Sequence, residues 1–376
     1  MKNINKYFPL ISITLIFVIS LFISEMILMI CYEKNNKKQI TRQINLREHN
    51  LNSINYHNIP NKELRFISNI ENKTYRIEID SSGFIFPSQV HKSPDTKIIF
   101  YGGSTTECLY VDEKERFPYL VGLQLSSFGE KVNAYNGGVS GNHSLHSINR
   151  LLNDGITHNP NIVVMKHNIN DLITLIYYNS YWNSGKKRLL ITKEIKQQNY
   201  KHATLKNFIH RIIPNLYYRL YLLKKRLFKN KLFEGDFADI NTEKISFNPK
   251  ALKSQFSKNL KMFIEICKIN NIVPVLMTQA NRFLPTPDKK VLEKFETNRF
   301  MNKVSYTDFK SMIDIFNHEI RQVSEASGVM CIDLDSIVPK DSLYLYDLVH
   351  YNKKGSRFIS EVISDSLKKV TLEIQY

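Results

Sequence analysis

Short apolar segments alternate with longer amphipathic ones along most of this 376-residue chain, and this alternation restricts the fold more than any other feature. The apolar segments are residues 97–101, 131–135, 162–165, 272–277 and 329–334. Helical spacing of apolar residues marks residues 252–269, 306–326 and 354–370. This repeated strand–helix–strand order predicts an α/β domain with a parallel sheet and helices on both of its faces.

Polar residues follow the predicted strands, at the edge where parallel sheets bind their ligands. Ser104 lies in GGSTTE after the first strand, Gly141 in VSGN after the second, and Asn170 in NIND after the third. Near the carboxyl end, Asp347 and His350 lie in DLVH, just before a predicted helix. We therefore expect these five residues to meet at one edge of the sheet.

These residue types match what the hydrolysis of an ester requires. Ser104 offers a nucleophilic hydroxyl, and His350 a base suited to neutral pH. Asp347, three residues earlier, is close enough to hold the imidazole in one tautomer. The backbone amides of Ser104 and Gly141 and the side chain of Asn170 are the candidate oxyanion donors. Each signal alone is typical of a turn or a cap, and only their joint order is specific.

The four blocks resemble those of the SGNH (GDSL-type) hydrolases. The resemblance implies a three-layer α/β/α, flavodoxin-like fold over residues 96–376, without cofactor or metal. It assigns the nucleophile to Ser104, the oxyanion contacts to Gly141 and Asn170, and the remaining triad positions to Asp347 and His350. Two positions depart from the family pattern. A glycine, residue 103, replaces the usual aspartate before the serine, and an asparagine, residue 168, replaces the usual glycine of the third block.

Several other side chains are candidates for the site. Asn168 is predicted to narrow the pocket or to contact the substrate. Arg282, beyond the strand at 272–277, is expected either to bind an acidic group of the substrate or to lie on the surface. Cys108 is expected to pack behind the nucleophile. Four histidines lack metal-ligand spacing and are expected at the surface or lining the site: His143, His146, His158 and His167.

The amino end contains an almost uninterrupted apolar segment, residues 8–31, which is long enough to span a bilayer as a helix. We therefore predict an uncleaved, single-pass anchor over residues 1–32; a cleaved signal peptide and a lipoprotein are the alternatives. Residues 33–95 are predicted to form a juxtamembrane linker followed by a short hairpin at 75–88. Lys and Arg are more numerous after the segment than before it, which by charge alone favours a cytoplasmic domain, although long domains often translocate regardless.

A long insertion, predicted to be helical, interrupts the α/β pattern at about 172–250. Between residues 186 and 231 it carries 14 Lys and Arg against a single acid, out of a net charge of +17 for the chain. It is interpreted as a lid over the site or as a surface that lies on anionic lipid. No nucleic-acid motif accompanies it, so no nucleic-acid partner is predicted.

The sequence thus predicts a membrane-anchored serine esterase that cleaves an oxygen ester through an acyl-enzyme. Extracytoplasmic proteins that resemble it are often tied to acetyl groups of surface polysaccharides. That resemblance implies an O-acetylated glycan as substrate and favours a periplasmic or cell-surface catalytic domain. Two alternatives stay open: an O-acyltransferase with the same triad, and a glycan-binding or assembly component without chemistry.

Overall fold

The structure, a computed structural model, describes residue 9 and residues 12–24, 38–44, 46–182, 191–197, 245–298 and 301–373. The chain divides into two compact units, one formed by residues 1–44 and 191–234, the other by residues 45–190 and 235–376. The second unit contains a five-stranded sheet and all the candidate site residues.

The sheet of the larger unit is parallel throughout, with the spatial order β5-β4-β6-β8-β9. Its strands are β4 (Thr96–Gly102), β5 (Val132–Gly138), β6 (Ile162–Lys166), β8 (Val273–Met277) and β9 (Met330–Ile332). In chain order this is the 2-1-3-4-5 arrangement of flavodoxin-like sheets. The order reverses between β4 and β6, so the ends of these two strands flank the expected ligand crevice.

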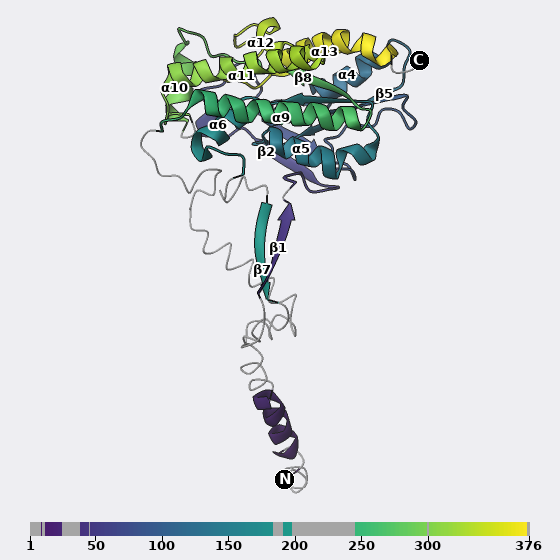
Figure 1. The fold of residues 1–376 in the computed structure, drawn as a ribbon, viewed down its shortest axis with the longest axis vertical. Helices are drawn as coiled ribbons and strands as arrows, with labels where there is room; N and C mark the ends of the chain where they lie inside the picture. The colour runs from purple at the N-terminus through teal and green to yellow at the C-terminus, as the bar shows by residue number, and fades with distance from the viewer. Residues whose placement is uncertain are drawn as a thin grey trace. The chain divides into compact units, whose positions relative to one another are not determined.

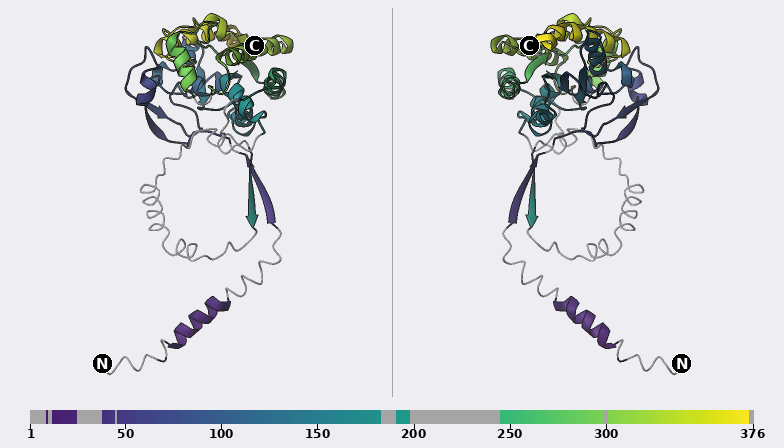
Figure 2. Two further views of the ribbon diagram at one scale, coloured as in Figure 1. Left: turned by 90° about the vertical axis from the view of Figure 1, so that its left-hand side faces the viewer. Right: turned by 90° about the vertical axis from the view of Figure 1, so that its right-hand side faces the viewer.

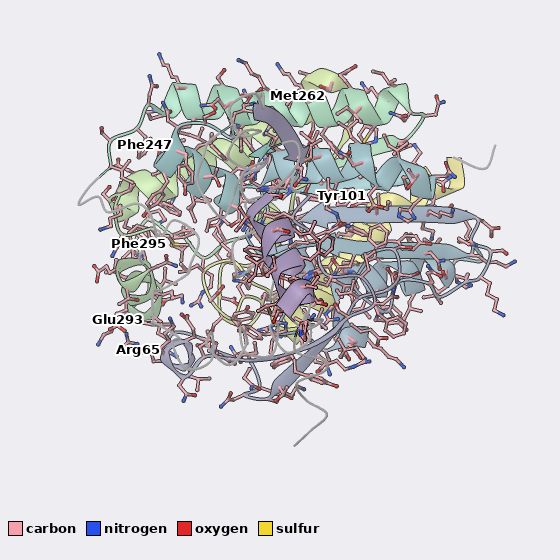
Figure 3. All side chains as sticks on the ribbon, turned by 90° about the horizontal axis from the view of Figure 1, so that it is seen from below. Arg65, Tyr101, Phe247, Met262, Glu293 and Phe295 are labelled. Atoms are coloured by element: carbon pink, nitrogen blue, oxygen red, sulfur yellow. The ribbon has the colours of Figure 1, made fainter. Side chains whose placement is uncertain are left out.

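The two faces of the sheet pack into separate apolar cores because successive side chains of a strand point to opposite sides. Ile99 and Tyr101 of β4 contribute to one core, and Ile98 and Phe100 to the other. All four side chains are almost completely buried. Figure 3 shows Tyr101 inside the domain and Met262, which is 41% exposed, on the outer side of its helix.

Helices cover both faces of the sheet (Figures 1 and 2). One core is closed by α5 (Ser144–Asn153), α6 (Ile169–Tyr178), α9 (Pro249–Ile269), α10 (Lys289–Thr297) and α11 (Tyr306–Ser327). The other is closed chiefly by α4 (Phe117–Ser126) and α13 (Lys353–Glu373). Shorter helices are α2 (Asn61–Leu64), α3 (Ser104–Glu107), α12 (Leu334–Ile337), η2 (Glu113–Glu115) and η3 (Gly155–His158). The predicted parallel sheet with helices on both faces is therefore confirmed.

The segment before the sheet differs from its prediction. Part of the expected linker is a strand, β2 (Ile54–Asn58), which pairs antiparallel with β3 (Thr74–Glu78). The expected hairpin at 75–88 is reduced to a turn with a single bridge between Ile79 and Ile85, and Gly83 adopts a left-handed conformation in that turn. Ile85 also bridges to Asn136 at the free edge of β5.

The smaller unit contains one antiparallel pair, β1 (Lys38–Ile44) with β7 (Ile191–Gln197). Both elements correct the predictions: β1 lies in the expected linker, and β7 is a strand inside the insertion that was predicted to be helical. Both segments contain Ile and Thr, β-branched residues that favour strands over helices. The remainder of the basic segment 186–231, including its predicted helix, lies outside the described residues.

Residues 12–24, within the predicted anchor, form a helix, and all but Ser12 have exposed side chains. In the part of the chain that the structure describes, no helix combines the length and apolar character needed to cross a bilayer. The rest of the predicted anchor lies outside the described residues.

Candidate active site

The predicted nucleophile lies in a sharp turn between β4 and the short helix α3. Gly103 precedes Ser104 in an extended conformation, and α3 begins at Ser104 itself. A β-carbon at residue 103 would collide with the side-chain amide of Asn170 and approach the Asn142 carbonyl oxygen to 3.2 Å. The glycine that replaces the family's aspartate therefore allows Asn170 to lie directly beside the nucleophile turn.

Ser104, His350 and Asp347 form a continuous hydrogen-bonded relay. Ser104 Oγ lies 2.7 Å from His350 Nε2. On the other side of the ring, His350 Nδ1 lies 2.8 Å from Oδ2 and 2.9 Å from Oδ1 of Asp347. With Asp347 ionised, Nδ1 carries the proton and donates to it, which leaves Nε2 to accept from the serine hydroxyl. The arrangement can therefore activate Ser104 as a nucleophile.

The carboxylate of Asp347 is strongly biased toward its ionised form. Burial alone would raise its pKa, but attraction to His350 and the hydrogen bond with its ring oppose this. Oδ1 also accepts the backbone N–H groups of Val349 at 3.0 Å and His350 at 2.9 Å. Together these interactions lower the pKa of Asp347 to about 2. The Tyr346 ring stacks on the imidazole of His350, with 5.5 Å between the ring centroids, and further restricts the orientation of the imidazole.

Of the three predicted oxyanion donors, the Ser104 amide follows β4, and the other two follow the strands that flank β4. Gly141, in the loop after β5, adopts a left-handed conformation with φ +80°, which favours glycine. Asn170, in the first turn of α6, donates from Nδ2 to the Asn142 carbonyl oxygen at 2.9 Å. This bond ties the Asn170 amide to the Gly141 loop beside Ser104.

We expect Asn170→Ala to lower kcat for ester hydrolysis by roughly 100-fold, because removal of one oxyanion donor typically costs about 3 kcal/mol in the transition state. Steady-state kinetics on an aryl acetate measures the effect. The exposed Asn153, changed to alanine, is the matched control. Turnover within a factor of three of wild type in Asn170→Ala would contradict the assigned role.

Asp171, next to Asn170, connects the two helices that follow β5 and β6. Its Oδ1 accepts from the Ser144 backbone N–H at 3.0 Å and from the Tyr181 hydroxyl at 2.6 Å. Since Ser144 begins α5, shortly after Gly141, the carboxylate connects the first turn of α6 with the start of α5. The sequence signal for this contact was only its position in the third block.

Asn168 is buried between two helices. The side chain is 1% exposed, and its Nδ2 donates to the Ile313 carbonyl oxygen at 3.0 Å and to Asn317 Oδ1 at 2.8 Å, both on α11. Asn168 therefore connects the start of α6 with α11, and its predicted roles in the pocket stay predictions.

Arg282 is buried rather than free to meet an acidic substrate. Its side chain is 7% exposed and pairs with Asp288 at 2.6 Å. Its backbone N–H donates to the Leu348 carbonyl oxygen at 2.8 Å, next to Asp347. The predicted surface role is therefore wrong, and this arginine supports the loop that carries the Asp–His pair.

Three of the four histidines are also more buried than expected. His143, His146 and His167 lie in the interior, whereas His158 is partly exposed. His167 bonds Ser147 Oγ at 2.7 Å, and burial lowers its pKa to about 3, which keeps it neutral. Within the described ranges, no three His, Cys, Asp or Glu side chains form a group that could hold a metal ion.

The expected packing of Cys108 is found. The thiol is 6% exposed and belongs to the core that α4 and α13 close. Burial raises its pKa to about 11, so it stays protonated at neutral pH.

Lys166, which the sequence pattern did not single out, is a buried lysine behind the nucleophile turn. Its side chain is 1% exposed, and Nζ donates to the Thr105 carbonyl oxygen at 3.0 Å. The ring centroids of Tyr351 and Phe117 lie 4.4 and 5.0 Å from Nζ. Burial lowers its pKa to about 7. A single lysine at the end of the buried segment IVVMK was the available signal.

We expect the free energy of unfolding to rise with pH through Lys166. Between about pH 7 and 10 the unfolded chain binds this proton and the folded chain does not, so each pH unit adds about 1.4 kcal/mol. Lys166→Met should flatten this dependence and add on the order of 2 kcal/mol at pH 7, after allowance for the unpaired Thr105 carbonyl. Urea unfolding from pH 6 to 10 tests it, with the exposed Lys131→Met as control. Parallel pH profiles for wild type and Lys166→Met would refute it.

No protein-family model matches the chain, and no curated protein sequence matches it either. Among solved structures it is similar to the lipase/acylhydrolase from Enterococcus faecalis, with 16% identity, a TM-score of 0.40, and coverage of 73% of this chain and 96% of that one. It is also similar to a catalytic mutant of an acetylxylan esterase from Geobacillus stearothermophilus, with 12% identity, a TM-score of 0.41, and coverage of 73% and 95%.

A third similar structure is a lipolytic protein of the G-D-S-L family from Desulfitobacterium hafniense, with 13% identity, a TM-score of 0.40, and coverage of 73% of this chain and 100% of that one. Identities and TM-scores this low leave the functional assignment to the geometry of the site itself.

Proposed function

We propose that this protein is a serine ester hydrolase of the SGNH type, which cleaves an O-acetyl ester on a carbohydrate through an acyl-enzyme. The observation that supports this most directly is the relay from Ser104 through His350 to Asp347, with distances of 2.7 and 2.8 Å. A protein that only binds glycan has no need of a serine, a histidine and an ionised carboxylate in that order.

The proposed reaction has two balanced halves. Ser104 Oγ attacks the acyl carbon while His350 Nε2 takes the hydroxyl proton, and Asp347 stabilises the imidazolium that forms. The oxyanion accepts hydrogen bonds from the Ser104 and Gly141 amides and from Asn170. The tetrahedral intermediate then expels the sugar alkoxide, which takes the proton from His350. Water then attacks the acyl carbon while His350 Nε2 takes its proton. Collapse of this second tetrahedral intermediate breaks the bond to Ser104 Oγ, which takes the proton back from His350, and the acid is released.

A fluorophosphonate probe tests whether the site performs this chemistry. We expect covalent labelling of the wild-type protein on Ser104, located by peptide mass spectrometry, and no labelling of Ser104→Ala or of heat-denatured protein. Equal labelling of Ser104→Ala would place the reactive group elsewhere. No labelling of the folded wild type would favour the glycan-binding alternative.

Product analysis tests the substrate and the acceptor. Incubation with O-acetylated polysaccharide and no added acceptor should release free acetate in the wild type and not in Ser104→Ala. Acetylated glycan formed only when a separate acyl donor is present would identify the acyltransferase instead, because a sugar hydroxyl then replaces water in the second half-reaction.

We further propose that the amino-terminal apolar segment holds the catalytic unit at a membrane, on its extracytoplasmic side. The apolar run at residues 8–31 supports this. Along the helix at 12–24, large side chains such as Leu15, Phe17 and Phe22 are more than half exposed, a surface that water does not favour. Membrane fractionation and protease accessibility in spheroplasts, which lack an outer barrier, test both points: a protein that carbonate extracts, or that protease reaches only after lysis, contradicts the proposal.

The basic segment 186–231 is proposed to rest on anionic lipid or to act as a lid over the site. Its 14 basic residues support the first reading. Flotation of the protein without residues 1–32, with anionic and with neutral liposomes at low and high salt, distinguishes these two roles, because the apolar segment would bind both lipids. Binding that requires anionic lipid and weakens with salt supports the lipid contact, and equal flotation with both lipids contradicts it.

A further inference from the structure

A short segment before the catalytic fold, residues 46–50, lies against the loop that carries Gly141; we call it the strap. Arg47 Nη2 donates to the Ser140 carbonyl oxygen at 3.1 Å. In the opposite direction, Asn142 Nδ2 donates to the Arg47 carbonyl oxygen at 3.1 Å. The residues immediately before and after Gly141 are therefore both bonded to a single residue of the strap.

Arg47 holds this position in a left-handed backbone conformation, with φ +52°. Such a conformation is uncommon for a residue with a side chain and costs roughly 1 kcal/mol or more, so surrounding contacts must maintain it. Here the guanidinium and the carbonyl of the same residue both reach the Gly141 loop, which accounts for that backbone.

Glu107 provides a second connection between the strap and the site. It closes α3, three residues after Ser104, and is 3% exposed. Its Oε2 accepts from Ser140 Oγ, and its Oε1 lies 3.2 Å from His49 Nε2 of the strap. One buried carboxylate thus joins the nucleophile turn, the Gly141 loop and the strap.

The backbone that leads into the Gly141 loop packs closely against the backbone of Glu107. A β-carbon at Gly138 would collide with the backbone of Glu107. Further along the strap, Glu48 lies 4.0 Å from the buried Arg150, whose Nη1 donates to the Gly137 carbonyl oxygen at 3.0 Å. The loop is therefore held by hydrogen bonds at Gly137, at Ser140 just before Gly141, and at Asn142 just after it.

This arrangement matters because a donor to an oxyanion is effective only when it is placed before the charge develops. Glycine in a left-handed loop has little conformational preference of its own to keep its amide in place. A displacement of about 1 Å in such a group can cost on the order of 100-fold in rate.

We propose that Arg47 and Glu107 are positioning residues that hold the Gly141 amide toward the oxyanion, so that the strap is part of the active site. The inference rests on the proposed hydrolase function. It implies that a segment of the predicted linker, residues 46–50, influences the catalytic rate through the Gly141 loop, not through contact with the substrate.

The test uses full-length protein with Arg47→Met, which keeps the aliphatic stem and removes the donor, and with Ser140→Ala and Ser140→Thr. We expect kcat to fall roughly tenfold in Arg47→Met and in Ser140→Ala, with KM within twofold, because the lost contacts act on the transition state. Ser140→Thr, which retains a hydroxyl that can donate to Glu107, should keep most of the wild-type kcat. The rate of fluorophosphonate labelling should fall in parallel with kcat.

Matched controls come from similar side chains at the periphery. Figure 3 labels Arg65 and Glu293 together at one side of the domain, far from Tyr101. Arg65→Met and Glu293→Gln should leave kcat and the labelling rate unchanged, and Glu107→Gln should lower both. If Glu107→Gln fails to fold, the Arg47 and Ser140 variants decide the matter by themselves.

Two results would overturn the inference. Wild-type kcat and labelling rates in both Arg47→Met and Ser140→Ala would remove the positioning role. A rise in KM with unchanged kcat would make the strap a substrate contact instead. Neither result resembles failure of the proposed function, in which the wild-type protein itself would not be labelled.

Discussion

Replacing Ser104 by alanine is expected to lower kcat/KM for ester hydrolysis by roughly 10⁵-fold, because the acyl-enzyme route loses its nucleophile. The residual rate should still exceed that in water, since Gly141 and Asn170 would continue to stabilise a tetrahedral intermediate formed by direct attack of water. The variant loses only one hydrogen bond, from Ser104 Oγ to His350 Nε2, so its melting temperature should stay close to that of wild type.

The measurement is steady-state hydrolysis of an aryl acetate and of an acetylated oligosaccharide, with thermal unfolding followed in parallel. Ser127, an exposed serine at the end of α4, serves as the control when it is changed to alanine. A loss of less than tenfold in Ser104→Ala, with the fold intact, would mean that another group performs the attack.

The second large effect is expected for Asp347→Asn, with a fall in kcat of about 10⁴-fold. Asn is nearly isosteric, but its amide can donate to Nδ1 and thereby moves the imidazole proton to Nε2, where it can no longer accept from Ser104. An asparagine oxygen could still accept the backbone N–H groups of Val349 and His350, so the loop should keep its conformation.

Stability at acid pH gives an independent check on the same substitution. The pKa of Asp347 is lowered to about 2 in the folded protein, so its contribution to stability is present above about pH 4 and is lost as the pH falls through about 2. Asp347→Asn should therefore be less stable than wild type at pH 7, by up to about 2.5 kcal/mol, and should converge with it below pH 2.

Asp341→Asn is the matched control, because Asp341 lies six residues earlier in the same loop and accepts the Leu343 backbone N–H at 2.8 Å. Its kcat should be unchanged. A fall of less than tenfold in Asp347→Asn would show that another group orients His350.

Most of the layered fold could be predicted from the apolar pattern. The predicted strands at 97–101 and 162–165 correspond to β4 and β6, and the predicted helix at 306–326 to α11, with ends that differ by at most one residue. Continuous burial on both faces of a parallel sheet demands short, wholly apolar strands, and that demand is visible in one sequence.

The segment before β4 was harder to predict because its partners are distant in sequence. Fifteen residues separate β2 from β3, with which it pairs, and Ile85 bridges to Asn136 of β5. The polar composition of residues 33–60 indicated a linker, yet a strand at an edge of a structure can be polar on its exposed side. Which strand a short segment joins depends on the edges available after folding.

The apolar pattern of the chain was enough to place Ser104, Gly141 and Asn170 just after three strands. Because parallel strands end at one edge of the sheet, the same pattern predicted that these residues lie near one another. The use of the other side chains at that edge became visible only in the folded protein. Asn168 is directed to α11, Arg282 pairs with Asp288, and the strap bonds the Gly141 loop. A hydrogen bond forms only when its donor and acceptor are at the right distance to within a few tenths of an ångström. Between segments far apart in the chain, that distance is set by the packing of the whole domain and not by the local sequence.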